Sequence, residues 1–200
     1  MPAKSQSHGR IGEAAVYAKC WMHGIPAYHT GGLRANFAGS DLIVETSDPR
    51  VKLWVQVKAG APILKGHVYL TQCAGDHELQ GGKFVSDFVV FVNIELYRAK
   101  SHTHDGSLGF DHLSFYVVPG VDASRLYQQA LASWAHKPKR DGGQRKLGNM
   151  AVHIEGSLLA QYRDAWHLMR ALSGGGANPF IEATAESSLR EPSAGPHVER

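Results

Sequence analysis

The sequence predicts an α/β fold, and three features of the chain support this prediction. A segment with apolar residues at helical spacing comes first, and short segments rich in β-branched residues follow it. Two nearly continuous apolar runs, residues 87–94 and 114–118, are typical of strands that are buried on both faces of a sheet. This order, with further helical patterns at the end of the chain, indicates a central mixed β-sheet flanked by helices.

The first half of the chain predicts one helix and three strands. Residues 8–24 have apolar side chains at helical spacing, and a glycine and a proline mark the end of the helix. Strands are expected at residues 28–30, 40–46 and 52–58, and a Ser-Asp-Pro turn separates the last two. The helical stripe expected to face the core consists of Ile11, Ala14, Ala15, Ala18, Trp21 and Met22.

The second half predicts three further helices around the two apolar runs. Residues 67–80 favour a helix, and residues 122–134 favour another, with Asp122 as its N-cap. Residues 158–172 indicate the last helix. The tryptophans at helical apolar positions are expected in the core: Trp21, Trp134 and Trp166.

Length and composition indicate one soluble domain. A chain of 200 residues buries roughly 70% of its unfolded surface. We expect residues 1–172 to form the domain, and residues 173–200, rich in Ala, Ser, Glu and Pro, to form a flexible tail. No apolar run approaches the ~18 residues of a membrane span, and the polar N-terminus has no signal-peptide core. Cys20 and Cys73 are far apart and are expected to be buried thiols, which favours a cytoplasmic protein without a disulfide framework or zinc finger.

The strands at 40–46 and 52–58 carry the polar residues of greatest interest. If they form a hairpin centred on the turn, Asp41 faces Gln56, and Lys58 lies on the same face of the sheet as Gln56. Glutamine and lysine are seldom buried without a partner, so their position among valines needs an explanation. A structural interpretation also exists, in which Asp41 caps a strand and the other two residues form a polar edge face.

Three segments together resemble the PD-(D/E)xK nuclease superfamily. They are Gly12-Glu13 on the first helix, Gly39-Ser40-Asp41-Leu-Ile-Val44, and Trp54-Val-Gln-Val-Lys-Ala59. The superfamily includes restriction endonucleases, Holliday-junction resolvases and some homing endonucleases. The resemblance covers residues 8–118 and implies a restriction-endonuclease-like core of the order αβββαβ, to which this chain adds C-terminal helices.

The resemblance also assigns roles to individual residues. Asp41 matches the metal-binding aspartate of the motif, Lys58 matches its lysine, and Glu13 matches the acid that many members carry on the first helix. Gln56 takes the place of the second acid, which gives the QxK variant found in some active members such as certain homing endonucleases. Ser40 replaces the motif proline. The catalytic set is therefore expected to be Asp41, Gln56, Lys58 and Glu13.

Hydrolysis of a phosphodiester requires a positioned water molecule and stabilisation of negative charge on the phosphate, and Mg²⁺ can supply both. The resemblance implies that Mg²⁺, with Mn²⁺ as a possible substitute, is held by Asp41, Glu13, the Gln56 side-chain oxygen and the Val57 carbonyl oxygen. Lys58 would orient the water or stabilise the charge, and it would need a lowered pKa to act as a general base. A surface role for Glu13 remains open.

The formal net charge of +3 is unevenly spread. Residues 137–146 carry five cations and one acid, and such a patch can contact phosphate. A solvated loop is the alternative interpretation. The residues expected to bind nucleic acid are Lys137, Lys139, Arg140, Arg145 and Lys146.

These observations together predict a metal-dependent DNA endonuclease, with duplex or branched DNA as its partner. A homodimer is expected if both strands of a duplex are cut. Two alternatives remain: an inactive nucleic-acid-binding module on the same fold, because Gln56 removes a charge from the motif, and a nuclease that acts on RNA or branched DNA. The histidines at 102, 104 and 112 are interpreted as a surface cluster rather than a metal site.

Overall fold

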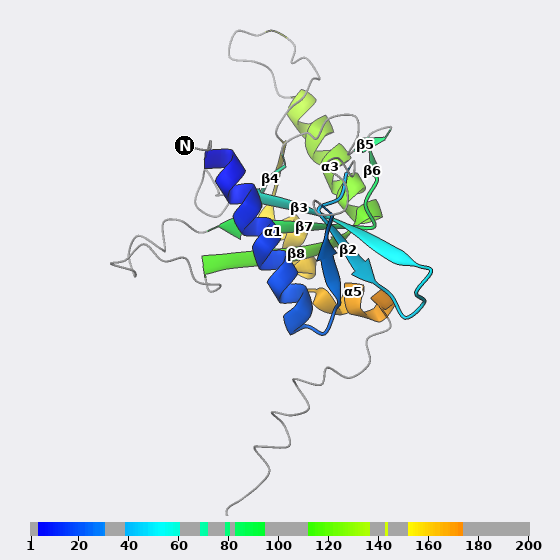
Figure 1. The fold of residues 1–200 in the computed structure, drawn as a ribbon. Coiled ribbons are helices and arrows are strands. Elements are labelled where there is room, and N and C mark those ends of the chain that lie inside the picture. The colour runs from blue at the N-terminus through cyan, green and yellow to red at the C-terminus, as the bar shows by residue number, and fades with distance from the viewer. Residues whose placement is uncertain are drawn as a thin grey trace, which may run out of the picture.

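The computed structural model describes residues 4–30, 39–60, 69–71, 79–80, 83–94, 112–136, 143 and 152–173. The fold is of the α/β class, and its centre is a mixed five-stranded sheet in the order β1-β2-β3-β7-β8 (Figure 1). The strands are β1 (Ala27–His29), β2 (Leu42–Glu45), β3 (Lys52–Gly60), β7 (Phe88–Ile94) and β8 (Leu113–Pro119). The predicted α/β class with a central mixed sheet is confirmed, and so are these five strands.

The register of the sheet agrees with the hairpin predicted from the sequence. β2 and β3 are antiparallel, with Ile43 opposite Trp54 and Leu42 opposite Val55. β3 then runs parallel to β7, and β7 runs antiparallel to β8. Residues of the central strand β7 are buried on both sides, as its continuous apolar run predicts.

Helices cover both faces of the sheet. α1 (Lys4–Met22) crosses the face nearest the viewer in Figure 1, and α5 (Trp166–Ser173) contributes to the same hydrophobic core. α3 (Gly120–Ala135) packs on the opposite face through a second core that includes Val89 and Phe91 of β7. The two cores separate because successive side chains of each strand point to opposite faces.

The buried face of α1 differs from the predicted stripe. Ile11, Trp21 and Met22 are exposed, and Trp21 is 45% exposed, so this tryptophan does not belong to the core. The residues that contact the sheet are smaller: Gly12, Ala15, Val16 and Cys20 are buried. Ala15 belongs to the predicted stripe, so the prediction is correct there and wrong for the three large side chains. Small residues on the buried face allow α1 to approach the sheet closely.

The predicted helix over residues 67–80 is wrong where the structure describes that segment. β4 (Tyr69–Thr71) pairs antiparallel with β9 (Val152–Ile154), and β5 (Leu79–Gln80) pairs with β6 (Lys83–Phe84). The aromatic, aliphatic and β-branched residues of β4 suit a strand once a distant partner such as β9 is present. Pairing with a strand this far along the chain could not be read from local periodicity.

Two details of the C-terminal helices also correct the predictions. The N-cap of α3 is Pro119, so Asp122 lies inside the first turn, where its carboxylate binds Arg125 at 3.1 Å. The predicted helix over 158–172 is divided into α4 (Gly156–Leu159), a 3₁₀ turn (Ala160–Tyr162) and α5.

The interruption before α5 occurs because β8 holds the chain. The Asp164 amide donates a hydrogen bond of 2.9 Å to the Phe115 carbonyl, and Asp164 has a positive φ of 49°. Such a conformation is incompatible with a continuous helix but is tolerated by aspartate. The turn places Trp166 in the core at 2% exposure, as predicted, while Trp134 is only partly buried.

Candidate functional site

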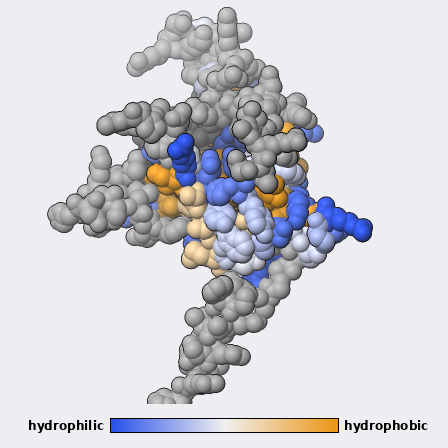
Figure 2. All heavy atoms as spheres, in the orientation of Figure 1, coloured by the Kyte–Doolittle hydropathy of each residue, from blue (hydrophilic) through white to orange (hydrophobic). Residues whose placement is uncertain are grey.

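β3 supplies the centre of the candidate site. Gln56 lies beside Val89 and Lys58 beside Phe91 in the parallel pairing with β7. Both side chains therefore project from the sheet face that α3 covers, while Val57 between them faces α1. The turn that joins β2 to β3 is far from these residues and forms a hydrophilic projection in Figure 2.

Asp41 is fixed to β3 by hydrogen bonds. Its amide donates to the Val55 carbonyl at 2.9 Å, and its carboxylate Oδ2 accepts the Val57 amide at 2.6 Å. The Asp41 carbonyl accepts the Thr30 amide at 3.0 Å and the Thr30 hydroxyl at 3.1 Å. The carboxylate is thus held on the β2 side of β3, level with the residue that separates Gln56 from Lys58.

Glu13 comes near Asp41 because α1 lies directly against β3. A Cβ on Gly12 would overlap the Cβ of Ala59 and would lie 3.4 Å from Val57 Cγ1, so only glycine permits this approach. The half-buried Glu13 side chain follows on the next helical position. Burial raises the pKa of Glu13, the negative charge of Asp41 raises it further, and Arg10 opposes both effects.

Gln56 is the most buried polar member of the group. It is 2% exposed, and within the described residues its Oε1 atom has no hydrogen-bond partner. A buried amide oxygen without a donor costs about 1–3 kcal/mol. An oxygen in this state is suited to accept a cation or an ordered water molecule.

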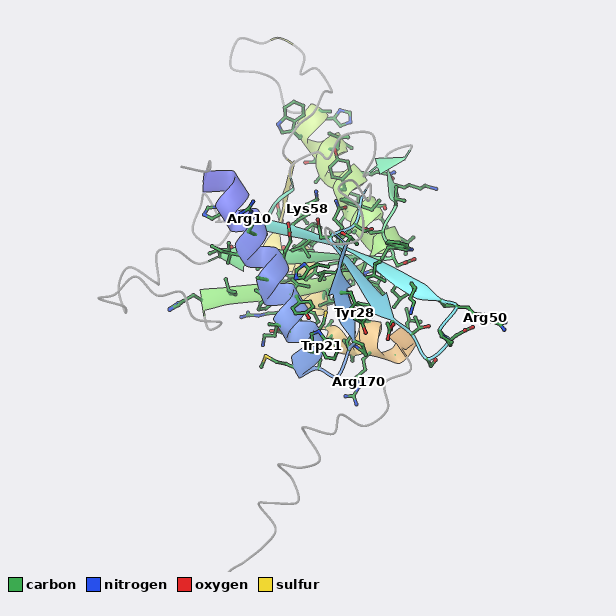
Figure 3. The ribbon with its side chains drawn as sticks, in the orientation of Figure 1. Arg10, Trp21, Tyr28, Arg50, Lys58 and Arg170 are labelled. Carbon is green, nitrogen blue, oxygen red and sulfur yellow. The ribbon has the colours of Figure 1, made fainter. Side chains whose placement is uncertain are left out.

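Two cationic side chains accompany the carboxylates. Lys58 is half-buried, and Arg10 is exposed on α1 one turn before Glu13. Figure 3 shows Arg10 and Lys58 in the region where the N-terminal half of α1 passes β3. Sequence reasoning did not include Arg10, although its i, i+3 spacing from Glu13 on a helix was a visible signal.

The ligands expected for a metal ion include two carboxylates, those of Asp41 and Glu13. Across the part of the chain that is described, no group of three or more His, Cys, Asp and Glu residues could hold a metal ion. Any site here would therefore combine the two carboxylates with neutral oxygens, namely Gln56 Oε1 and the Val57 carbonyl. Mg²⁺ accepts such an arrangement because it keeps several water ligands of its own.

Several sequence-predicted residues fall outside this arrangement. Outside the described residues lie the basic residues at 137, 139, 140, 145 and 146, Cys73, the histidines at 102 and 104, and the tail beyond 173. His112 was predicted at the surface, but it is buried at 7% exposure, so that prediction is wrong for this histidine. Cys20 is buried as predicted, and burial raises the pKa of its thiol to about 12. No helix within the described ranges is long and apolar enough to cross a membrane.

Comparison with known proteins gives a distant likeness to a solved structure. No protein-family model and no curated protein matches the chain. Among solved structures, the chain is similar to a bacterial homing endonuclease, I-Ssp6803I, at 14% identity and a TM-score of 0.38, over 94% of this chain and 100% of that one. A TM-score of this size does not establish a common fold.

Proposed function

We propose that the chain is a metal-dependent DNA endonuclease of the PD-(D/E)xK type. The observation that carries the proposal is the position of the Asp41 carboxylate, which accepts the Val57 amide at 2.6 Å between Gln56 and Lys58. Glu13 joins the group from α1, close enough for Asp41 to raise its pKa. These are the four residues that the sequence motif requires, and they come from three separate segments of the chain.

The arrangement of elements supports a restriction-endonuclease-like core in most of its parts. One helix, three antiparallel strands and a strand parallel to the third follow one another in the order that this core has for those elements. The second helix of that core is not found at residues 69–71 and 79–80, which are strands. α3, which follows β8, covers the corresponding face of the sheet.

Asp41 and Glu13 would hold Mg²⁺ or Mn²⁺ with Gln56 Oε1 and the Val57 carbonyl. The bound cation would supply charge neutralisation and activation of water. The chain itself contributes a carboxylate, Asp41, that is fixed before substrate arrives, so little reorganisation is needed. Lys58 would bind a phosphate oxygen or orient the attacking water.

The substrate proposed is duplex or branched DNA. The basic segment at residues 137–146 would contact its backbone, and a homodimer would bring one site to each strand. Cleavage assays with RNA and with DNA would distinguish an RNA substrate from the proposed DNA substrate. An inactive DNA-binding module is the second candidate, and the observation that favours it is Gln56, a neutral amide where the motif has a carboxylate.

The experiment that tests the proposal is plasmid cleavage with MgCl₂ or EDTA by the wild type and by Asp41→Asn. The asparagine can still accept the Val57 amide, so only the charge is removed. We expect a loss of at least roughly 100-fold in rate. Asp48→Asn is the matched control, since Asp48 accepts the Arg50 amide at the exposed turn. Undiminished cleavage by Asp41→Asn would refute the site, and EDTA-resistant cleavage would refute metal dependence.

A further inference from the structure

A cavity of about 590 Å³ opens where β6 and the beginning of β7 meet the first turn of α3. Its lining includes Lys83, Ser86, Asp87, Val121 and Arg125. Asp87 accepts the Trp54 amide at 2.7 Å, whereas Asp41 accepts the Val57 amide. Three residues along a strand span about 10 Å, so this cavity is separate from the candidate metal site.

The first turn of α3 is positioned against the main chain of residues 86 and 87. The Gly120 amide donates to the Asp87 carbonyl at 2.7 Å, and a Cβ on Gly120 would overlap the Ser86 carbonyl oxygen. Pro119 is the N-cap, and it provides no side-chain hydrogen bond to the amides that follow. Amides of an uncapped first turn carry partial positive charge and attract anions.

Ser86 provides a second and independent observation. Ser86 belongs to the lining of the cavity and is 3% exposed, and its buried Oγ atom has no hydrogen-bond partner in the described ranges. Ser124 lines the same cavity but is fully engaged: its hydroxyl accepts the Phe84 amide at 2.9 Å and donates to the Gly120 carbonyl at 2.6 Å. Buried hydroxyls are normally paired, so the Ser86 hydroxyl calls for an acceptor from a ligand.

The charges around the cavity favour an anion. Lys83 and Arg125 are exposed and lie in its lining. Arg125 binds Asp122 and also interacts with Tyr162, and its guanidinium has five N–H donors in all. Asp87 is the acid in the lining, and its Oδ2 atom is occupied by the Trp54 amide. The lining therefore holds two cations and one hydrogen-bonded carboxylate, and Arg125 is also paired with Asp122 beside it.

We propose that this cavity binds a phosphate group. The Val121 amide, the Ser86 hydroxyl, Lys83 and Arg125 are its donors. Helix N-termini combined with cations and hydroxyls are suited to phosphate because its oxygens accept several hydrogen bonds at once. The phosphate can belong to a free phosphomonoester or to the backbone of a nucleic acid, and the site does not depend on the carboxylates of the proposed nuclease centre.

The test is calorimetric titration in EDTA at constant ionic strength with three probes: inorganic phosphate, a 5′-phosphorylated dinucleotide and the same dinucleotide without its terminal phosphate. Ser86→Ala removes the unpaired hydroxyl. Val121→Pro removes one first-turn amide at a position where proline is tolerated, and Val121→Ala is its control because it keeps the amide. We expect roughly tenfold weaker binding for the first two variants and no change for Val121→Ala.

Each result decides for or against the site. If inorganic phosphate and the 5′-phosphorylated dinucleotide bind but the dinucleotide without its terminal phosphate does not, the site is assigned to phosphomonoesters. If the dinucleotide without its terminal phosphate also binds, the site is assigned to a backbone phosphodiester. No saturable binding of any probe to the wild type, or binding that Ser86→Ala and Val121→Pro both leave unchanged, overturns the proposal. If Val121→Pro does not fold, Ser86→Ala decides alone. Binding retained by Asp41→Asn separates this site from the proposed nuclease centre.

Discussion

Val57 donates its amide to the Asp41 carboxylate at 2.6 Å, at the point where the main-chain pairing of β2 with β3 has ended. The last strand pair is Leu42 opposite Val55, and the Asp41 amide still reaches the Val55 carbonyl. The carboxylate therefore accepts a hydrogen bond from a β3 amide that does not pair with a β2 carbonyl. Asp41 has a structural role and a proposed metal-binding role, and substitutions can separate the two.

Asp41→Ala is expected to lower the free energy of unfolding by about 1–3 kcal/mol, because the Val57 amide loses its acceptor. Asp41→Asn should cost clearly less, since its side-chain oxygen can replace Oδ2. Urea unfolding of the two variants beside the wild type measures the difference. Equal stability of all three proteins would show that solvent satisfies this amide as well as the carboxylate does.

Gln56→Glu is expected to tighten divalent-cation binding, because it adds a carboxylate beside Asp41 and Glu13. Without a cation the same change should destabilise the fold, since a third negative charge is then buried at 2% exposure. Unfolding measured by circular dichroism with EDTA and with MgCl₂ should show stabilisation by Mg²⁺ that is larger than in the wild type. The apolar variant Gln56→Leu is the control.

Gln56→Leu removes an oxygen that has no hydrogen-bond partner among the described residues, so it should fold well. It should nevertheless bind Mg²⁺ more weakly if Gln56 Oε1 is a ligand. Wild-type Mg²⁺ affinity in Gln56→Leu would remove Gln56 from the ligand set and leave it as a buried structural amide.

The sequence was sufficient for the hairpin and its register, because a short turn and a period of two fix both register and face. It was not sufficient for α1, where small residues rather than large apolar ones contact the sheet, nor for β4, whose partner β9 lies far along the chain. The break at Asp164 depends on a hydrogen bond to β8. In each case a long-range contact outweighed the local pattern.

Gly12→Ala is expected to destabilise the protein by about 1–3 kcal/mol, because the new methyl group overlaps Ala59. The shift of α1 would also move Glu13 away from Asp41. Gly9→Ala, one turn earlier on α1, meets nothing within 4 Å and should stabilise the helix by about 0.5–1 kcal/mol. Thermal unfolding of the pair tests the close approach, and similar effects of both substitutions would contradict it.

Glu13 should make both stability and cation binding depend on pH. Its pKa is raised in the folded state, so its favourable contribution to folding is present below the unfolded pKa and is lost as pH rises through the folded pKa. Glu13→Gln should therefore increase stability at neutral pH and flatten that pH dependence.

Cation binding has the opposite pH dependence, because Mg²⁺ competes with the proton on Glu13. Affinity should rise with pH, and binding near the raised pKa should release a proton. Calorimetry in two buffers of different ionisation enthalpy measures that release. The control is Glu45→Gln, which removes the carboxylate that pairs with Lys52 at 3.0 Å and should leave the proton release unchanged. Proton release that persists in Glu13→Gln would assign the proton to another group.

The basic segment at residues 137–146 follows α3 and is expected to contact phosphates rather than bases. Its cations flank Asp141-Gly-Gly143, a sequence that suits tracking along a backbone better than reading base edges. Replacing Arg140 and Arg145 with glutamine should weaken binding of cognate and scrambled duplexes alike. The magnitude of the slope of log K against log salt concentration should decrease by about 2, because each phosphate contact that is lost means that roughly one fewer counterion is released on binding. Binding measured at several salt concentrations gives the slope. A loss of affinity confined to one DNA sequence would show that the segment contacts bases. An unchanged slope would place the DNA on another surface of the protein.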